Sequence, residues 1–166
     1  MSLSSAPEHR LPQTLHFDCR PFAPGDLNTI YSIEAECFDP PLRFSRNLLR
    51  SLCFDPRFDT WLAQVDLLPV GFAIVGLSPE PSRDAAYLWT IEILPAYRRL
   101  GLGHRLMARV EDSVLQANLP ALELHADEQN LAARQLYLSL GFQLIGDEPG
   151  FYGPGQNALL FRKQYA

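Results

Sequence analysis

The sequence predicts one α/β domain, a mixed sheet flanked by helices. The chain has 166 residues, the length of a single domain with a substantial core. Hydrophobic residues make up 47% and charged residues 20%, which is ordinary globular usage. Apolar residues repeat with the period of strands and of helices in the order βααβββαβαββ, and both long helices fall between strands.

The first third of the chain predicts a tail, a strand and two helices. Residues 1–13 read as a flexible tail without the apolar core of a secretory signal, and residues 14–166 as the domain. A strand is predicted over 14–22, followed by a turn. Asp26 caps a helix that runs to Phe38, and Ser45 caps a second, short helix.

The rest of the chain alternates strands with two longer helices. Strands are predicted over 60–66 and 70–77 around a turn at Leu68-Pro69, and over 85–94 after a polar loop. The next helix has apolar residues at Leu102, Leu106, Met107, Val110, Val114 and Leu115. Then come a strand over 121–126, a helix from Asn130 to Gly141 with Ala132 on its apolar face, and strands over 142–147 and 157–163.

Charge, hydropathy and cysteine spacing exclude several functions. The net charge of −5 argues against a nucleic-acid binder, and no run approaches the ~20 apolar residues of a membrane helix. Cys19, Cys37 and Cys53 have no metal-binding spacing and read as reduced thiols, and no histidine pair has metal-ligand spacing. We therefore expect a cytoplasmic protein that binds no nucleic acid, membrane or metal.

A glycine turn follows the longest predicted strand. Arg98 and Arg99 precede Gly101-Leu102-Gly103, which opens a helix. Free amides at a helix start, the helix dipole and nearby arginines favour a bound phosphate. The turn lacks the Gly-Lys-Ser/Thr of a P-loop and the third small residue of a dinucleotide fingerprint. An ordinary glycine turn with a solvated basic face remains the alternative.

Two motifs together resemble the GNAT acetyltransferase superfamily. The first is R-x-x-G-x-G from Arg98 to Gly103, and the second is N-x-x-A-x-x-L-Y-x-x-x-G-F from Asn130 to Phe142. The resemblance extends from Phe17 to Phe161 and implies the GNAT fold, with acetyl-CoA as acyl donor. The stretch 87–103 is similar to one eukaryotic type of protein N-terminal acetyltransferase, and bacterial enzymes that acetylate a ribosomal protein are also similar.

The resemblance also implies which residues hold acetyl-CoA. The backbone of Ile91, Glu92 and Ile93 would line the acetyl and pantetheine arm, with the Ile93 amide as oxyanion donor. The pyrophosphate would lie against Arg98, Arg99, Leu100, Gly101, Leu102, Gly103 and His104. Asn130 would contact the pantetheine arm, although a plain helix cap is equally consistent with its position.

Three residues are implied in proton transfer. Tyr137 would contact the bound cofactor and protonate its leaving sulfur. Tyr87 with His125 would take the proton of the amine through an ordered water. Core packing is the alternative for Tyr137 and His125. Glu92 is a rival base, but strand alternation places it opposite Tyr87 and Ile93 unless the strand bulges. Cys37 has no histidine nearby in sequence, so direct attack in a ternary complex is preferred to an acyl-enzyme.

The acceptor site is expected at two loops. Phe38, Pro41 and Leu42 match the peptide-binding loop of the similar enzymes, and Tyr152 matches their final hairpin, in which Phe151 replaces a second tyrosine. We expect an N-acetyltransferase acting on the α-amine of a protein N-terminus. The alternatives are acetylation of a small amine and a non-catalytic acyl-CoA-binding domain, and the acyl group could be slightly larger than acetyl.

Overall fold

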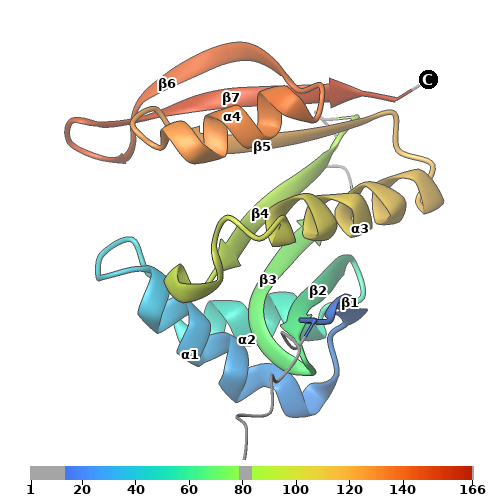
Figure 1. Ribbon diagram of the computed structural model, residues 1–166. Helices are drawn as coiled ribbons and strands as arrows, with labels where there is room; N and C mark the ends of the chain where they lie inside the picture. The colour runs from blue at the N-terminus through green and yellow to red at the C-terminus, as the bar shows by residue number, and fades with distance from the viewer. Residues whose placement is uncertain (1–13, 79–83, 166) are drawn as a thin grey trace, which may run out of the picture.

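A computed structural model describes residues 14–78 and 84–165 and has the predicted order of helices and strands. Seven strands form one sheet in the order β1-β2-β3-β4-β5-β7-β6 (Figure 1). The strands are β1 (Phe17–Pro21), β2 (Phe58–Val65), β3 (Leu68–Gly76), β4 (Ala86–Ile93), β5 (Ala121–Asp127), β6 (Gln143–Gly153) and β7 (Gln156–Gln164). The predicted tail and residues 79–83 of the predicted polar loop lie outside the described residues.

Four helices cover the two faces of the sheet. They are α1 (Leu27–Cys37), α2 (Arg46–Phe54), α3 (Leu102–Gln116) and α4 (Leu131–Ser139). Side chains of α1 and α2 pack on Leu62, Phe72 and Ile74 of one face. The larger core lies on the other face, where α3 packs on β2–β5 and Tyr137 of α4 joins it. The mixed sheet with flanking helices confirms the predicted fold class.

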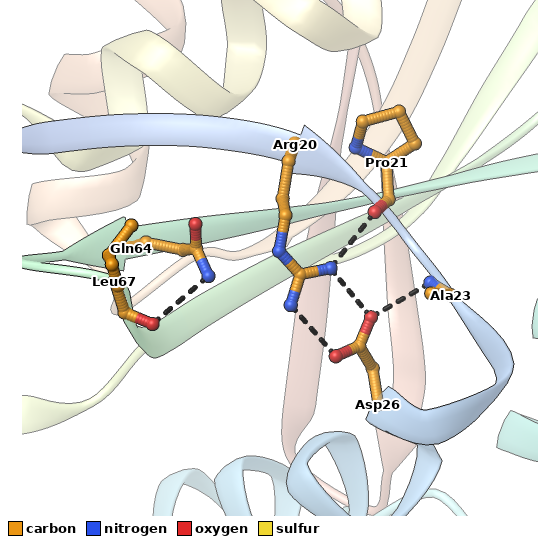
Figure 2. A network of polar contacts seen from close by, with 6 residues as sticks. All are labelled: Arg20, Pro21, Ala23, Asp26, Gln64 and Leu67. Atoms are coloured by element: carbon orange, nitrogen blue, oxygen red, sulfur yellow. Dashed lines mark hydrogen bonds and ion pairs between the residues drawn. The ribbon is translucent and has the colours of Figure 1, made fainter.

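The junction of β1 and α1 is held by one ion pair. Arg20 donates two hydrogen bonds to the Asp26 carboxylate, at 2.7 and 2.8 Å, and a third to the Pro21 carbonyl (Figure 2). Asp26 also accepts from the Ala23 amide, so its carboxylate caps the 3-10 turn before α1. These contacts lower the pKa of Asp26, chiefly through the Arg20 hydrogen bonds.

The side-chain caps of α2 and α4 lie where the sequence predicts them, whereas Asp26 precedes α1 but makes no side-chain cap hydrogen bond on it. Ser45 accepts from the Leu48 amide and Asn130 from the Ala133 amide. Gly141 has a φ of +86° just after α4, as a C-terminal glycine should. Leu115 is 52% exposed and Ala132 is also exposed, so neither belongs to the apolar face predicted for it. Each lies at the edge of the apolar face of its helix, and the limits of such a face are poorly defined by periodicity alone.

The β2–β3 turn lies earlier than predicted. Leu68 and Pro69 belong to β3, and the turn consists of Asp66 and Leu67, whose φ angles are 48° and 68°. Consecutive residues with positive φ match the twist of a tight hairpin. The Gln64 amide stabilises this turn by donating to the Leu67 carbonyl (Figure 2). Pro69 suggests a turn in the sequence, but proline is also tolerated near the start of a strand, where the structure places it.

The sheet divides between β4 and β5. These strands are parallel and pair over only three positions, Ala86–Leu88 with Leu122–Leu124, whereas the other neighbouring strands are antiparallel. Figure 1 shows β4 and β5 diverging from this short contact. The remaining edge of β4 is therefore not paired with another strand of the described chain. Among the described residues, no helix is long and apolar enough to cross a membrane.

Candidate active site

The turn before α3 presents a row of backbone amides. None of the hydrogen bonds among the described residues uses the amides of 99–104 as donors. Residues 98–101 and 104 are exposed, so these donors are not sealed by packing. Such amides at the positive end of a helix dipole bind phosphate groups well. The arrangement fits a diphosphate.

Two glycines shape this turn for different reasons. Gly101 caps α3 with a φ of +80°, a conformation that other residues adopt at a cost. A Cβ on Gly103 would lie 3.3 Å from Cδ2 of Leu136, so the small residue lets α3 start close to α4. Arg98 donates from Nε to the Ile93 carbonyl, 2.9 Å away, and Arg99 is exposed with a φ of 63°. His104 contacts the Ser139 hydroxyl at 3.3 Å.

The last residues of β4 direct backbone groups toward the division in the sheet. The Leu94 amide donates to the Val70 carbonyl, and successive residues of a strand alternate in direction. Ile91 and Ile93 therefore direct their amides away from β3, to the side that β5 leaves uncovered. An extended ligand could pair with this edge, and the Ile93 amide could stabilise a developing oxyanion.

A bulge at Trp89 overturns the face expected for Glu92. Pairing with β3 passes from Thr90 directly to Leu88, so Trp89 is an extra residue in β4. Ile91 and Ile93 pack on the larger core with Leu88, whereas Glu92 contacts Glu34 of α1. Tyr87 therefore shares its face with Glu92 and not with Ile93. Uniform alternation could not predict this, because one extra residue reverses the order of the faces.

Glu92 and Glu34 form a buried carboxyl pair. They are 3% and 2% exposed, and Glu34 is near enough to raise the pKa of Glu92. Glu92 also accepts from the Thr90 hydroxyl at 2.7 Å, and Glu34 from the Phe44 amide at 2.6 Å. Burial, followed by the nearby Glu34, raises the pKa of Glu92 to about 9. Glu92 thus keeps its proton at neutral pH and is poorly suited to accept one.

Tyr87 and His125 meet across the β4–β5 contact. The Tyr87 hydroxyl lies 2.7 Å from Nδ1 of His125, and Phe151 stacks on the imidazole with its centroid 4.1 Å away. Nε2 of His125 lies 3.1 Å from Oε1 of Glu148. Sequence reasoning missed Glu148, which no motif marks and which β6 brings to β5 only through β7.

Tyr137 and Tyr152 lie near each other and near Tyr87. Tyr137 is 4% exposed, and burial, followed by Tyr152 and Tyr87, raises its pKa well above the ordinary value. Burial raises the pKa of Tyr152 to about 12, with Tyr87 and Asp127 as further causes. Both phenols therefore stay protonated at neutral pH. The structure brings together Tyr87, His125, Tyr137 and Tyr152, which come from four separate elements.

The predicted acceptor loop connects α1 to α2 and is tied to the end of β4. Phe38 and Leu42 are each 37% exposed, and Pro41 is exposed as well. The Cys37 thiol lies 3.6 Å from the Ile93 carbonyl, and Arg98 reaches the same carbonyl. Burial, followed by Glu92, raises the pKa of Cys37 to about 11, so this thiol is a poor nucleophile.

Two further observations concern the ligands that the site could hold. Asn130 accepts the Ala133 amide at 3.1 Å through Oδ1, which satisfies its role as helix cap. Among residues 14–78 and 84–165, no three His, Cys, Asp or Glu side chains are grouped so that they could hold a metal ion.

Comparison with known proteins identifies relatives. A family model described as "Acetyltransferase (GNAT) family" matches residues 27–142. N-alpha-acetyltransferase daf-31 of Caenorhabditis elegans is 27% identical over 100 residues, which are 58% of this chain and 55% of that protein. Mycothiol acetyltransferase of Thermomonospora curvata is 32% identical over 130 residues, 74% of this chain and 43% of that protein. The chain thus spans about half the length of these curated relatives.

Solved structures share the fold. Ribosomal-protein-S18-alanine N-acetyltransferase from Escherichia coli superimposes with a TM-score of 0.78 at 24% identity, covering 90% of this chain and 94% of that one. Other similar structures, also covering 90% of this chain, were solved with acetyl-CoA.

Proposed function

The chain belongs to the GNAT family of acetyltransferases, and from that premise we propose that it transfers the acetyl group of acetyl-CoA to a primary amine. The exposed amides before α3 and the uncovered edge of β4 support this proposal, since they fit a diphosphate followed by an extended arm. The residues proposed to hold acetyl-CoA are the backbone of Ile91–Ile93, the turn from Arg98 to His104, Asn130 and Tyr137.

Acetyl-CoA supplies an activated thioester, and the chain's own groups manage charge and protons around it. The Ile93 amide stabilises the negative charge that develops on the acetyl oxygen. The amine attacks only when neutral, so Tyr87 with His125 accepts its proton, directly or through a water. Tyr137 then gives its proton to the departing sulfur. Its raised pKa suits this role, because the phenol stays protonated until the thiolate forms.

The acceptor that the site fits best is the α-amine of a protein N-terminus. The observation that carries this assignment is the 2.7 Å contact between Tyr87 and His125 at the division of the sheet. Exposed Phe38, Pro41 and Leu42 would line the first residues of such a peptide, and the half-buried Tyr152 would contact its backbone. The relatives carry names as different as N-alpha-acetyltransferase and mycothiol acetyltransferase, so the choice of acceptor needs a direct test.

The test is an acceptor screen with the purified protein. Acetyl-CoA would be offered with peptides that differ in their N-terminal residue and with amino acids, polyamines and aminoglycosides, while thiol release is measured. We expect turnover on free peptide N-termini and none on N-terminally blocked peptides. Turnover restricted to small amines would reject the peptide assignment. Binding of acetyl-CoA without turnover on any amine would favour a non-catalytic domain.

Tyr137→Phe tests the proposed acid. Loss of the hydroxyl should lower kcat by about 100-fold, because general acid catalysis typically contributes that much. Calorimetry should find the affinity for acetyl-CoA unchanged. Tyr165→Phe is the matched control, since Tyr165 hydrogen-bonds through its amide to Pro120, at the opposite end of β5 from His125. Equal kcat values for both variants would remove Tyr137 from this role.

A further inference from the structure

Nε2 of His125 is a buried polar atom with one polar neighbour. The His125 side chain is 4% exposed, and Phe151 covers its face at an interplanar angle of 12°. Nε2 has no aligned hydrogen bond within the described chain. Oε1 of Glu148 nevertheless lies 3.1 Å away, at ion-pair distance. A buried ring nitrogen without a partner is costly, so this carboxylate is the group that can satisfy it.

Glu148 is available for this contact. It lies on β6 opposite Ala158 of β7, and β7 pairs with β5. Its side chain is 44% exposed and has no other ion-pair or hydrogen-bond partner among the described residues. Neighbouring carboxylates are engaged elsewhere, since Glu123 pairs with Arg162 and Glu128 accepts from Asn157. A small rotation of Glu148 would align the contact at little cost.

A carboxylate at Nε2 determines where the imidazole carries its hydrogen. An ionised carboxylate only accepts hydrogen bonds, so it favours the ring form with hydrogen on Nε2. Nδ1 then has a lone pair and accepts from the Tyr87 hydroxyl, 2.7 Å away. The other ring form would place the lone pair of Nε2 against the Glu148 carboxylate, so that two acceptors would face each other.

We propose that Glu148 is a positioning residue that holds His125 in the Nε2–H form, with Nδ1 directed at Tyr87. The inference rests on the proposed function, in which Tyr87 receives the proton of the amine. As that proton reaches the Tyr87 oxygen, the hydroxyl's own proton passes to Nδ1. His125 becomes an imidazolium, and Glu148 balances its charge without taking a proton. After the product leaves, the proton returns to solvent by the same route.

Nuclear magnetic resonance tests the ring form independently of turnover. Protein labelled with 15N-histidine would be measured at a pH where the imidazole is neutral, with His125 assigned by its absence in His125→Asn. We expect hydrogen on Nε2 in the unaltered protein and a shift toward the Nδ1–H form in Glu148→Ala. Glu148→Gln, which keeps an accepting oxygen, should restore the Nε2–H form. An Nδ1–H ring in the unaltered protein, or no change in Glu148→Ala, would overturn the inference.

Kinetics tests the consequence for the reaction. Glu148→Ala should lower kcat about tenfold, less than the ~100-fold or more expected for a group that itself transfers the proton, and leave both KM values unchanged. Asp147→Ala is the matched control, because it removes the same charge from the adjacent, exposed residue of β6. An equal loss in Asp147→Ala, or a change in KM alone, would contradict the positioning role. If the unaltered protein acetylates nothing, the proposed function fails, while the ring form still decides this inference.

Discussion

At the scale of single residues, the buried pair of Glu34 and Glu92 makes stability depend on pH. The folded protein holds a proton on Glu92 up to pH 9 or so, whereas the unfolded chain releases it near the ordinary value of 4.5. A raised pKa in the folded state means that the free energy of unfolding falls as pH rises through this window. One such proton changes it by at most ~1.4 kcal/mol per pH unit.

Glu92→Gln should remove this dependence. The amide keeps the shape and can donate to Glu34, but it has no proton to lose. We expect the free energy of unfolding of the variant, relative to the unaltered protein, to increase steadily between pH 5 and pH 9. Urea denaturation at several pH values measures it. Glu36→Gln changes an exposed residue of α1, the helix that carries Glu34, and should leave the pH dependence of the free energy of unfolding unchanged. Parallel pH profiles for all three proteins would contradict the prediction.

Tyr87, His125 and Tyr137 could be named from the sequence because the resemblance to known acetyltransferases matches them residue by residue. The structure places these side chains near one another, and their catalytic roles remain a proposal. Glu148 and Glu34 could not be named in this way. Their partners lie on distant elements, and only the order β5-β7-β6 and the packing of α1 on β4 create those contacts.

At the scale of elements, the close approach of β3 to β4 depends on Gly71. A Cβ at this position would lie 2.5 Å from the Glu92 carbonyl and from Cδ1 of Ile93. Gly71→Ala should therefore lower the free energy of unfolding by about 2 kcal/mol or more, as overpacking commonly does. Chemical denaturation measures it.

Gly146→Ala is the comparison for Gly71→Ala, because its nearest new neighbour would be Cβ of Leu160 at 3.9 Å. The acetylation assay should show kcat reduced in Gly71→Ala alone, since the displaced backbone includes Ile93. If both substitutions lower the free energy of unfolding equally, the close approach of β3 to β4 does not explain why residue 71 is a glycine.

Element order could be predicted because apolar periodicity records which face of each helix or strand is buried. Local irregularities could not. The bulge at Trp89 changes one pairing without changing the pattern of apolar residues. Strand β6 extends to Gly153, beyond the predicted 142–147, because an edge strand tolerates the polar, proline and glycine residues that read as a loop.

At the scale of the whole molecule, acetyl-CoA should stabilise the fold. A ligand that binds only the folded state, present at 100 times its Kd, adds about 2.7 kcal/mol to the free energy of unfolding. For a chain of this size the Tm should rise by roughly 5–10 °C. S-acetylcysteamine has the same thioester without a diphosphate, so it should give no shift in differential scanning calorimetry. Equal shifts with both compounds would show that the turn before α3 does not hold the diphosphate.

The sequence alone supports one mixed α/β domain, yet it contains nothing that marks where neighbouring strands separate. That feature could be anticipated only through the resemblance to a family. Leu88 and Leu124 end the pairing of β4 with β5, although both strands continue beyond them, β4 through the bulge at Trp89. Residues of both strands belong to the same core as α3 and Tyr137 of α4, so the local sequence of either strand does not contain this information.

Three residue pairs are a narrow attachment between two large parts of one sheet. If strands β1–β4 rotate relative to strands β5–β7, this attachment is the place in the sheet where the fewest backbone pairs oppose the motion. A molecule bound along the uncovered edge of β4 would touch both parts and brace them. Its arrival would then stiffen the domain as a whole, and its departure would restore the freedom that lets a product escape.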